Sequence, residues 1–145
     1  MNKPESDAMM HLTYTVLGDD FTRAGEASGD VKRKLKKMGA DPEVTRKVAI
    51  VMYEGEINMV IHAGGGEIDV YITPDEVRMI LTDHGPGIAD IEKAMQAGYS
   101  TAPDNIRTLG FGAGMGLPNM KKYSDEMDIR TKVGEGTVVE MSVKM

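Results

Sequence analysis

Apolar and polar residues alternate near the start of the chain, where Leu12, Tyr14 and Val16 fall on one face of an extended segment and predict a half-buried strand. Comparable runs later in the chain predict further strands, most of which are joined by short turns into hairpins. The predicted strands span residues 11–17, 67–72, 77–83, 127–132 and 137–143. Hairpins of this kind favour a mainly antiparallel sheet.

The segments between these strands repeat apolar residues every three or four positions, which predicts helices. Asp41 is a candidate N-cap, Pro42 suits the first helical position, and the glycine run at 64–66 is a stop signal. The predicted helices span residues 21–38, 42–63, 90–97 and 117–124. Helices between hairpins predict an α+β fold in which helices cover a sheet.

Length and composition narrow the class of protein. The 145 residues fit one domain, expected over residues 11–145 after a loose lead-in at 1–10. The chain has no cysteine, no apolar export signal and no run of the ~18 apolar residues that a membrane span needs, so we expect a soluble, cytoplasmic protein without a membrane partner. A net charge of −6 argues against nucleic acid as a partner.

Basic residues gather at the end of the first predicted helix, within residues 32–37. A solvated face that complements the helix dipole explains this cluster best. A docking patch for an acidic partner is the alternative.

Two polar residues stand out on the long second helix, which is otherwise apolar on nearly every side. Glu54 and Asn58 are four positions apart, so they share a face of the helix. The amide oxygen of Asn58 could bind a hard cation while the Glu54 carboxylate polarises a nucleophile. A hydrogen bond between the two side chains is the alternative, because a buried charge is costly unless a partner compensates it.

Asp83 ends a predicted strand and points to the same face as the apolar residues of that strand. The sequence His-Gly-Pro-Gly-Ile follows at residues 84–88. A carboxylate at this edge of the core could accept a hydrogen bond from an exocyclic amine, and the glycines would let a flat ring approach the backbone. An Asp-initiated turn is the alternative explanation.

Four glycines at a spacing of two, from Gly110 to Gly116, run into the last predicted helix, whose first turn holds Pro118. Free backbone amides at such a helix start can bind phosphate. The spacing matches neither a Walker A loop nor a dinucleotide fingerprint. The whole stretch at 98–114 is long for a connector, which favours a functional loop over a flexible linker.

In their order and separation, these motifs resemble the N, G1 and G2 boxes of the GHKL ATP-binding superfamily. The resemblance spans about residues 21–143, and it is strongest with the stand-alone anti-sigma regulatory serine/threonine kinases of the switch type. The matching features are a Gly-Tyr-Ser-Thr lid at 98–101, Gly-Leu-Pro at 116–118 and Gly-Thr at 136–137. It implies the two-layer α/β sandwich of the GHKL (Bergerat) type, with helices on one face of a mainly antiparallel or mixed sheet.

The resemblance also implies a role for each matching residue in binding ATP and Mg²⁺. Asn58 would hold Mg²⁺, Asp83 would accept the adenine amine with support from Thr137, and Glu54 would act as general base. The other matching residues would line the nucleotide pocket or contact the phosphates: Gly85, Gly87, Ile88, Thr101, Gly110, Gly112, Gly114, Met115, Gly116 and Leu117.

The function that the resemblance implies is ATP- and Mg²⁺-dependent transfer of a γ-phosphate to a serine or threonine of a STAS-type anti-anti-sigma partner. A sigma factor or another regulator is a second class of partner, and the family allows a homodimer. The alternative is a nucleotide-dependent anti-sigma-type binding switch with little or no kinase activity. A scaffold that binds no nucleotide would require three motifs to coincide by accident.

Overall fold

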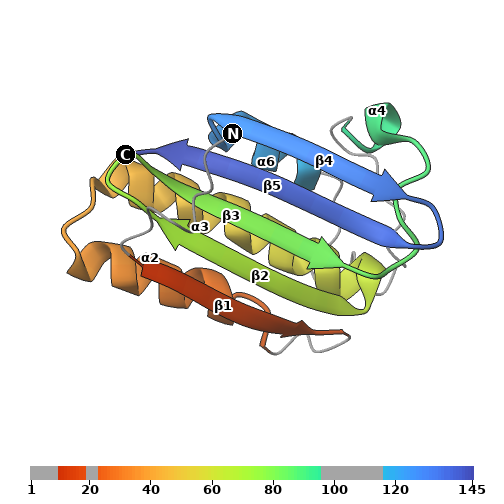
Figure 1. The fold of residues 1–145 in the computed structure, drawn as a ribbon, viewed down its shortest axis with the longest axis horizontal. Coiled ribbons are helices and arrows are strands. Elements are labelled where there is room, and N and C mark those ends of the chain that lie inside the picture. Colours follow the sequence, from red (N-terminus) through yellow and green to blue (C-terminus); the bar gives the residue numbers. More distant parts are fainter. Residues whose placement is uncertain (1–9, 19–22, 96–115) are drawn as a thin grey trace, which may run out of the picture.

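A computed structural model describes residues 10–18, 23–95 and 116–145 of the chain. Within them, five strands form one sheet in which every neighbouring pair is antiparallel. The strands are β1 (Met10–Leu17), β2 (Gly65–Ile72), β3 (Glu76–Asp83), β4 (Glu126–Lys132) and β5 (Gly136–Lys144). Their order across the sheet is β1-β2-β3-β5-β4, so two hairpins meet at the β3–β5 pair and β1 forms one edge (Figure 1).

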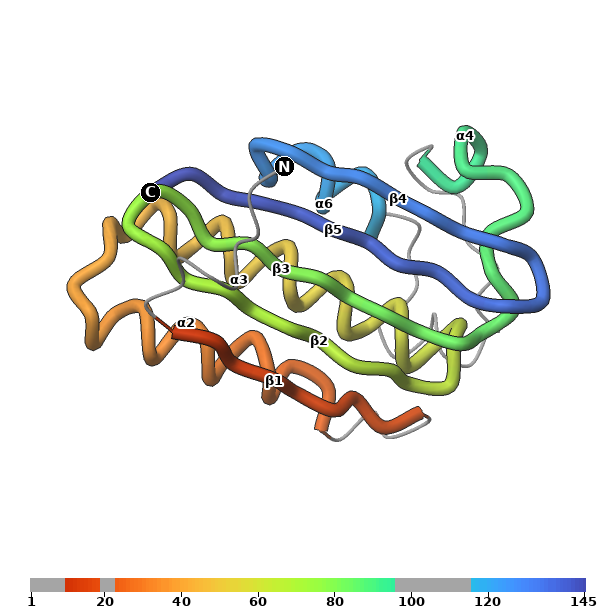
Figure 2. Tube along the Cα trace, in the orientation of Figure 1, coloured from red at the N-terminus to blue at the C-terminus, as the bar shows by residue number. Residues whose placement is uncertain are grey.

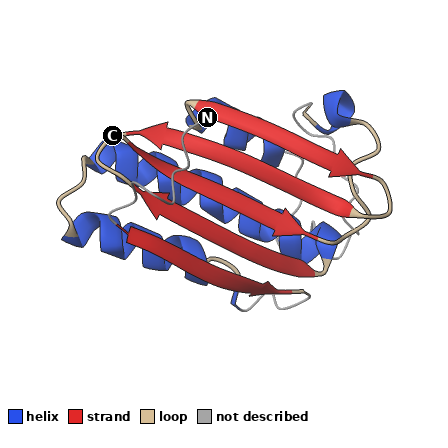
Figure 3. Cartoon of the chain, in the orientation of Figure 1, coloured by secondary structure: helices blue, strands red, loops and turns tan. Residues whose placement is uncertain are grey.

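The described helices are α2 (Glu26–Lys37), α3 (Pro42–Asn58), α4 (Ile91–Ala94) and α6 (Gly116–Tyr123), and a π-helix, η2 (Met59–Ala63), continues α3. Helices α2, α3 and α6 pack on one face of the sheet, as Figure 3 shows with the strands in front and these helices behind, whereas the short α4 lies beyond the end of β4 (Figure 1). Helix α3 lies between α2 and α6 behind the middle of the sheet (Figure 2). The predicted two-layer α+β fold is therefore confirmed. None of the described helices has both the length and the apolar character needed to span a membrane.

The start and end of the central helix follow the signals in the sequence. Asp41 accepts a hydrogen bond from the backbone N–H of Glu43 at 2.8 Å, and Pro42 occupies the first helical position. The helical segment ends at Ala63 because Gly64 adopts a left-handed conformation with φ 72°. The change from α to π geometry after Asn58 was not predicted, since no residue pattern marks it.

Two predicted helices are shorter than expected. We predicted the first helix from residue 21, but α2 begins at Glu26 because Gly25 has φ 96°, which is not helical. The apolar stripe of α2 is buried as predicted, with Ala27, Val31 and Leu35 in the core. The short helix predicted at 90–97 is α4, which Asp90 caps and which ends at Ala94.

The core fills the space between the sheet and the helices. Its members come from both layers, and the fully buried methionines among them are Met52, Met79, Met120 and Met141. Flexible thioether side chains fill irregular gaps between a sheet and crossing helices. Helix α3 is central and largely buried, as predicted, although Tyr53 on its outer side is 40% exposed.

Ion pairs on α2 account for part of the basic cluster. Lys34 Nζ lies 2.7 Å from Asp30 Oδ2, and Arg33 lies 3.6 Å from Asp30 Oδ1. The hydroxyl of Tyr14 on β1 donates to Asp30 Oδ2 at 2.5 Å. Burial and this hydrogen bond raise the pKa of Tyr14, while Lys34 and Tyr14 lower the pKa of the Asp30 carboxyl. The edge strand is thus fastened to α2 by a charged hydrogen-bond network.

Glu56 on α3 is a buried carboxylate that sequence reasoning did not single out, with a relative exposure of 2%. Its oxygens accept hydrogen bonds from the backbone N–H groups of Gly25 at 3.1 Å, Ala27 at 3.3 Å and Ser28 at 2.8 Å. These N–H groups belong to the first turn of α2 and have no partner within that helix. Glu56 therefore caps α2 from the neighbouring helix, and its charge suits the positive end of the helix dipole.

Replacing Glu56 by glutamine should lower the free energy of unfolding by about 3 kcal/mol, because one charged acceptor is lost and an amide donor then faces backbone donors. Urea denaturation followed by circular dichroism would measure the loss. Glu43→Gln is the matched control, since Glu43 is an exposed glutamate of the same helix paired with Arg46, and it should cost less than about 1 kcal/mol. Equal losses in the two variants would contradict the capping role.

Candidate functional site

Asp83 lies where β3 ends beside the start of β5, directly opposite Thr137 in the sheet register. Its Oδ1 atom accepts hydrogen bonds from the backbone N–H groups of Gly85 at 3.0 Å and Thr137 at 3.2 Å. The Asp-initiated turn is therefore present. Because both bonds go to Oδ1, Oδ2 accepts none from the part of the chain that the structure describes. The carboxylate is thus held in place through Oδ1 alone, as far as the described residues show.

Close packing explains the two glycines that follow Asp83. A Cβ atom at Gly85 would lie 2.6 Å from the Cα atom of Ala63, and one at Gly87 would lie 2.6 Å from the carbonyl oxygen of Lys132. Gly87 also has φ 80°, which favours glycine. These glycines fit the backbone of the π-helix and of β4 closely, and their expected approach to an adenine ring stays a prediction.

Thr131 on β4 completes this corner of the sheet, although sequence reasoning did not identify it. Its hydroxyl oxygen accepts a hydrogen bond from the backbone N–H of Ile88 at 2.9 Å. It also lies 2.8 Å from the hydroxyl oxygen of Thr137, its cross-strand partner. The predicted hairpin register could have found this pairing. Thr131 and Thr137 together place two hydroxyls beside Asp83.

Glu54 and Asn58 lie one turn apart on α3 and both face α6. Asn119 Nδ2 donates a hydrogen bond to Glu54 Oε2 at 2.6 Å. Asn58 Nδ2 contacts the sulfur of Met120 at 3.9 Å, and a Cβ atom at Gly116 would lie 3.0 Å from Asn58 Oδ1. The alternative of a hydrogen bond between Glu54 and Asn58 is therefore wrong, because each side chain is directed to a residue of α6 instead.

The pair formed by Glu54 and Asn58 lies at the same end of the sandwich as the corner at Asp83. The π-helix that follows Asn58 ends at Ala63, which contacts Gly85 in the turn after Asp83. In Figure 1 this is the end at which β3 finishes and the continuation of α3 meets it. The fold thus brings together motifs that are about 25 residues apart along the chain, as βα packing of an antiparallel sheet allows.

The other predicted site residues divide into two sets. Gly116 and Leu117 begin α6 as predicted, but the side chain of Leu117 is 8% exposed and belongs to the core, so only its backbone could face a ligand. The predicted lid at 98–101 and five predicted nucleotide contacts lie outside the described residues: Thr101, Gly110, Gly112, Gly114 and Met115.

The donor set near Asn58 fits Mg²⁺ only together with a phosphate ligand. Among the residues that the structure describes, no three His, Asp or Glu side chains are grouped so that they could hold a metal by themselves. Mg²⁺ commonly takes one or two protein oxygens and completes its shell with water and substrate phosphates. The amide oxygen of Asn58 could supply one such ligand.

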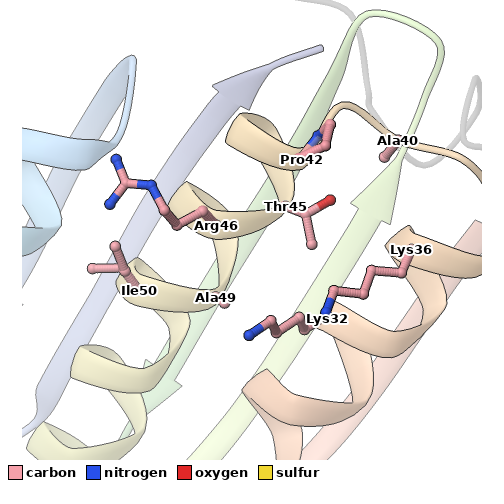
Figure 4. Close-up of a pocket in the computed structure, with 8 residues that line it drawn as sticks. All are labelled: Lys32, Lys36, Ala40, Pro42, Thr45, Arg46, Ala49 and Ile50. Carbon is pink, nitrogen blue, oxygen red and sulfur yellow. The ribbon is translucent and has the colours of Figure 1, made fainter.

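A separate pocket of about 350 Å³ lies between α2 and the first half of α3 (Figure 4). Lys32 and Lys36 line one side, and Thr45, Arg46 and Ile50 line the other. Arg46 also pairs with Glu43 and lies over the ring of Tyr123. This pocket is built from residues of α2, α3 and their connection that all precede Glu54, and it includes none of the candidate site residues.

Comparison with known proteins agrees with this architecture. The histidine kinase-like ATPase domain matches residues 19–143, and the chain belongs to this family, which implies ATP binding. Its curated relatives include a serine/threonine-protein kinase and several anti-sigma F factors.

Two curated relatives illustrate this. The chain is 31% identical to the serine/threonine-protein kinase RsbT of Bacillus subtilis over 109 residues, which cover 72% of this chain and 76% of RsbT. It is 33% identical to the anti-sigma F factor of Thermoanaerobacter sp. over 142 residues, which cover 98% of this chain and 87% of that protein. Among solved structures, the RsbU and RsbW domains of Rv1364c from Mycobacterium tuberculosis superpose with a TM-score of 0.61 at 15% identity, over 93% of this chain and 32% of that one.

Proposed function

We propose that the chain is an ATP- and Mg²⁺-dependent protein serine/threonine kinase whose phosphate acceptor is a STAS-type anti-anti-sigma domain. The observation that carries the proposal is the placement of Glu54 one turn before Asn58, with one carboxylate oxygen held by Asn119 at 2.6 Å. A carboxylate that is oriented beside a candidate Mg²⁺ ligand is suited to take a proton from a hydroxyl group.

In the proposed reaction, the hydroxyl group of the acceptor serine gives its proton to Glu54. The serine oxygen forms a bond to the γ-phosphorus, and the bond from that phosphorus to the β–γ bridging oxygen breaks. ADP leaves with the electron pair of that bond. Bound Mg²⁺ would neutralise charge on the phosphates, and Asn58 would supply it with an amide oxygen.

The base of the nucleotide is proposed to lie at the Asp83 corner. Asp83 Oδ2 would accept a hydrogen bond from the adenine amine, while Oδ1 stays bonded to the backbone of Gly85 and Thr137. The hydroxyls of Thr131 and Thr137 would support this contact. Phosphate contacts at Gly110, Gly112, Gly114, Met115 and Gly116, and contacts at Thr101, are proposed from the family resemblance.

A second candidate is a nucleotide-dependent switch that binds a sigma factor and transfers little or no phosphate. The relative named anti-sigma F factor, which matches nearly the whole chain, favours it. In such a switch Glu54 would not act as a base. The two candidate functions therefore differ in the rate at which the chain transfers phosphate to its partner.

The test is incubation of the purified chain with γ-labelled ATP, Mg²⁺ and each STAS-domain protein of its own genome. We expect label on one serine or threonine of a single partner, and no label after EDTA or in an Asn58→Ala variant. A wild-type chain that labels no partner, yet binds one only when nucleotide is present, would replace the kinase by the binding switch.

A further inference from the structure

Helix α6 contacts α3 through one face that carries a polar side chain. Gly116, Asn119 and Met120 are three and four positions apart, so they lie together on this face. The face lies against Glu54 and Asn58. Gly116 and Met120 offer packing contacts, whereas Asn119 offers a hydrogen-bond donor. Packing of the two helices does not require a hydrogen-bond donor at this position, so the amide of Asn119 calls for a separate explanation.

The hydrogen bond from Asn119 Nδ2 to Glu54 Oε2 is 2.6 Å long, which is short for an amide donor, and its acceptor is a carboxylate oxygen, which strengthens such bonds. An asparagine side chain has two torsion angles and is half-buried here, so it holds the carboxylate at a defined angle. Glu54 Oε1 accepts no hydrogen bond from the described residues. One oxygen of Glu54 is thus bonded to Asn119, and the other has no donor among the described residues.

The chemical nature of the donor matters. A lysine or arginine at this position would neutralise the carboxylate and compete with a proton for it. A neutral amide orients the carboxylate without cancelling its charge, which suits a group that must accept a proton.

We propose that Asn119 is a positioning residue for the phosphoryl transfer, and that it holds Glu54 Oε2 so that Oε1 faces the hydroxyl of the protein substrate. This inference rests on the proposed kinase function and on Glu54 as its base. In this role Asn119 acts through Glu54 and not on the reacting atoms themselves. The alternative is that the bond only joins α6 to α3.

The test is a double-mutant cycle between Asn119→Ala and Glu54→Gln, with the single-turnover rate of transfer to the cognate STAS domain as the readout. We expect Asn119→Ala alone to lower the rate about 10- to 100-fold, because a misdirected base loses the geometry of attack. In the Glu54→Gln background, Asn119→Ala should have no further effect. Asn119→Gln, which keeps an amide donor, should recover part of the rate.

Two controls separate positioning from other roles. ATP affinity, measured by calorimetry, should stay within about twofold of wild type in Asn119→Ala, because a positioning residue acts on kcat and not on binding. Lys121→Ala, an exposed neighbour on α6, should leave the rate unchanged.

Three results would overturn the inference. They are an unchanged rate in Asn119→Ala, rate losses that multiply in the double mutant, and a large loss of ATP affinity. A wild-type chain without any transfer would instead refute the proposed function, and the positioning role with it.

Discussion

Glu54→Gln should lower the single-turnover rate of phosphoryl transfer by about 100-fold and leave ATP affinity unchanged. Glutamine keeps the size of the side chain and can still take the hydrogen bond of Asn119 on its amide oxygen, but it cannot accept the proton of a serine hydroxyl. General bases contribute typically about 10²- to 10⁴-fold. We expect the lower end, because loose phosphoryl-transfer transition states depend more on positioning and electrostatics.

Single-turnover conditions are needed, because slow product release can hide a defect in the chemical step. Glu43→Gln, an exposed glutamate at the start of the same helix, is the matched control and should transfer at the wild-type rate. If Glu54→Gln also transfers at that rate, then Glu54 is a structural residue and another group takes the proton.

Asp83→Asn should weaken ATP binding by about 10- to 150-fold, which corresponds to the loss of a hydrogen bond to a charged group. Asparagine keeps an acceptor for the backbone N–H groups of Gly85 and Thr137, so the turn is preserved. In place of Oδ2 it presents an NH₂ group, which faces the adenine amine as a second donor. Titration calorimetry with ATP measures the change.

Asp41→Asn serves as the control. Asp41 also accepts a hydrogen bond from a backbone N–H group, but it caps the start of α3, at the end of the helix away from the candidate site. It should bind ATP like the wild type. The wild-type chain should bind GTP weakly, since guanine places a carbonyl where adenine has its amine. An Asp83→Asn variant with unchanged ATP affinity would place the base of the nucleotide elsewhere.

Periodicity located the strands and the central helix well, because their signals are local. The alternation at Leu12, Tyr14 and Val16 and the cap at Asp41 each involve a few neighbouring residues. The start of α2 was misplaced because the apolar stripe continues through Gly25, and only the backbone conformation of that glycine shows where the helix begins.

Residues that act across elements were harder to find. Asn119 matters because of a partner 65 positions away, and it lies in no recognisable pattern. The pairing of Thr131 with Thr137 follows from the hairpin register, but its contact with Ile88, 43 positions away, does not. Glu56 is one of several acidic residues on α3, and its burial depends on how α2 crosses the helix. Asn58 and Asp83 could be singled out because each is a polar residue at a position where the periodicity expects an apolar one, and Glu54 because it lies one turn before Asn58.

The place of β1 at the sheet edge has a consequence for the order of events during synthesis. Its hydrogen-bonding partner, β2, follows roughly 50 residues later, so at ribosomal speeds β1 waits about 3 to 10 s before it can pair. During that time the apolar face formed by residues such as Leu12, Tyr14 and Val16 is open to solvent. Strand β1 is therefore incorporated into the sheet only after α2, α3 and β2, which follow it in the chain, have been translated.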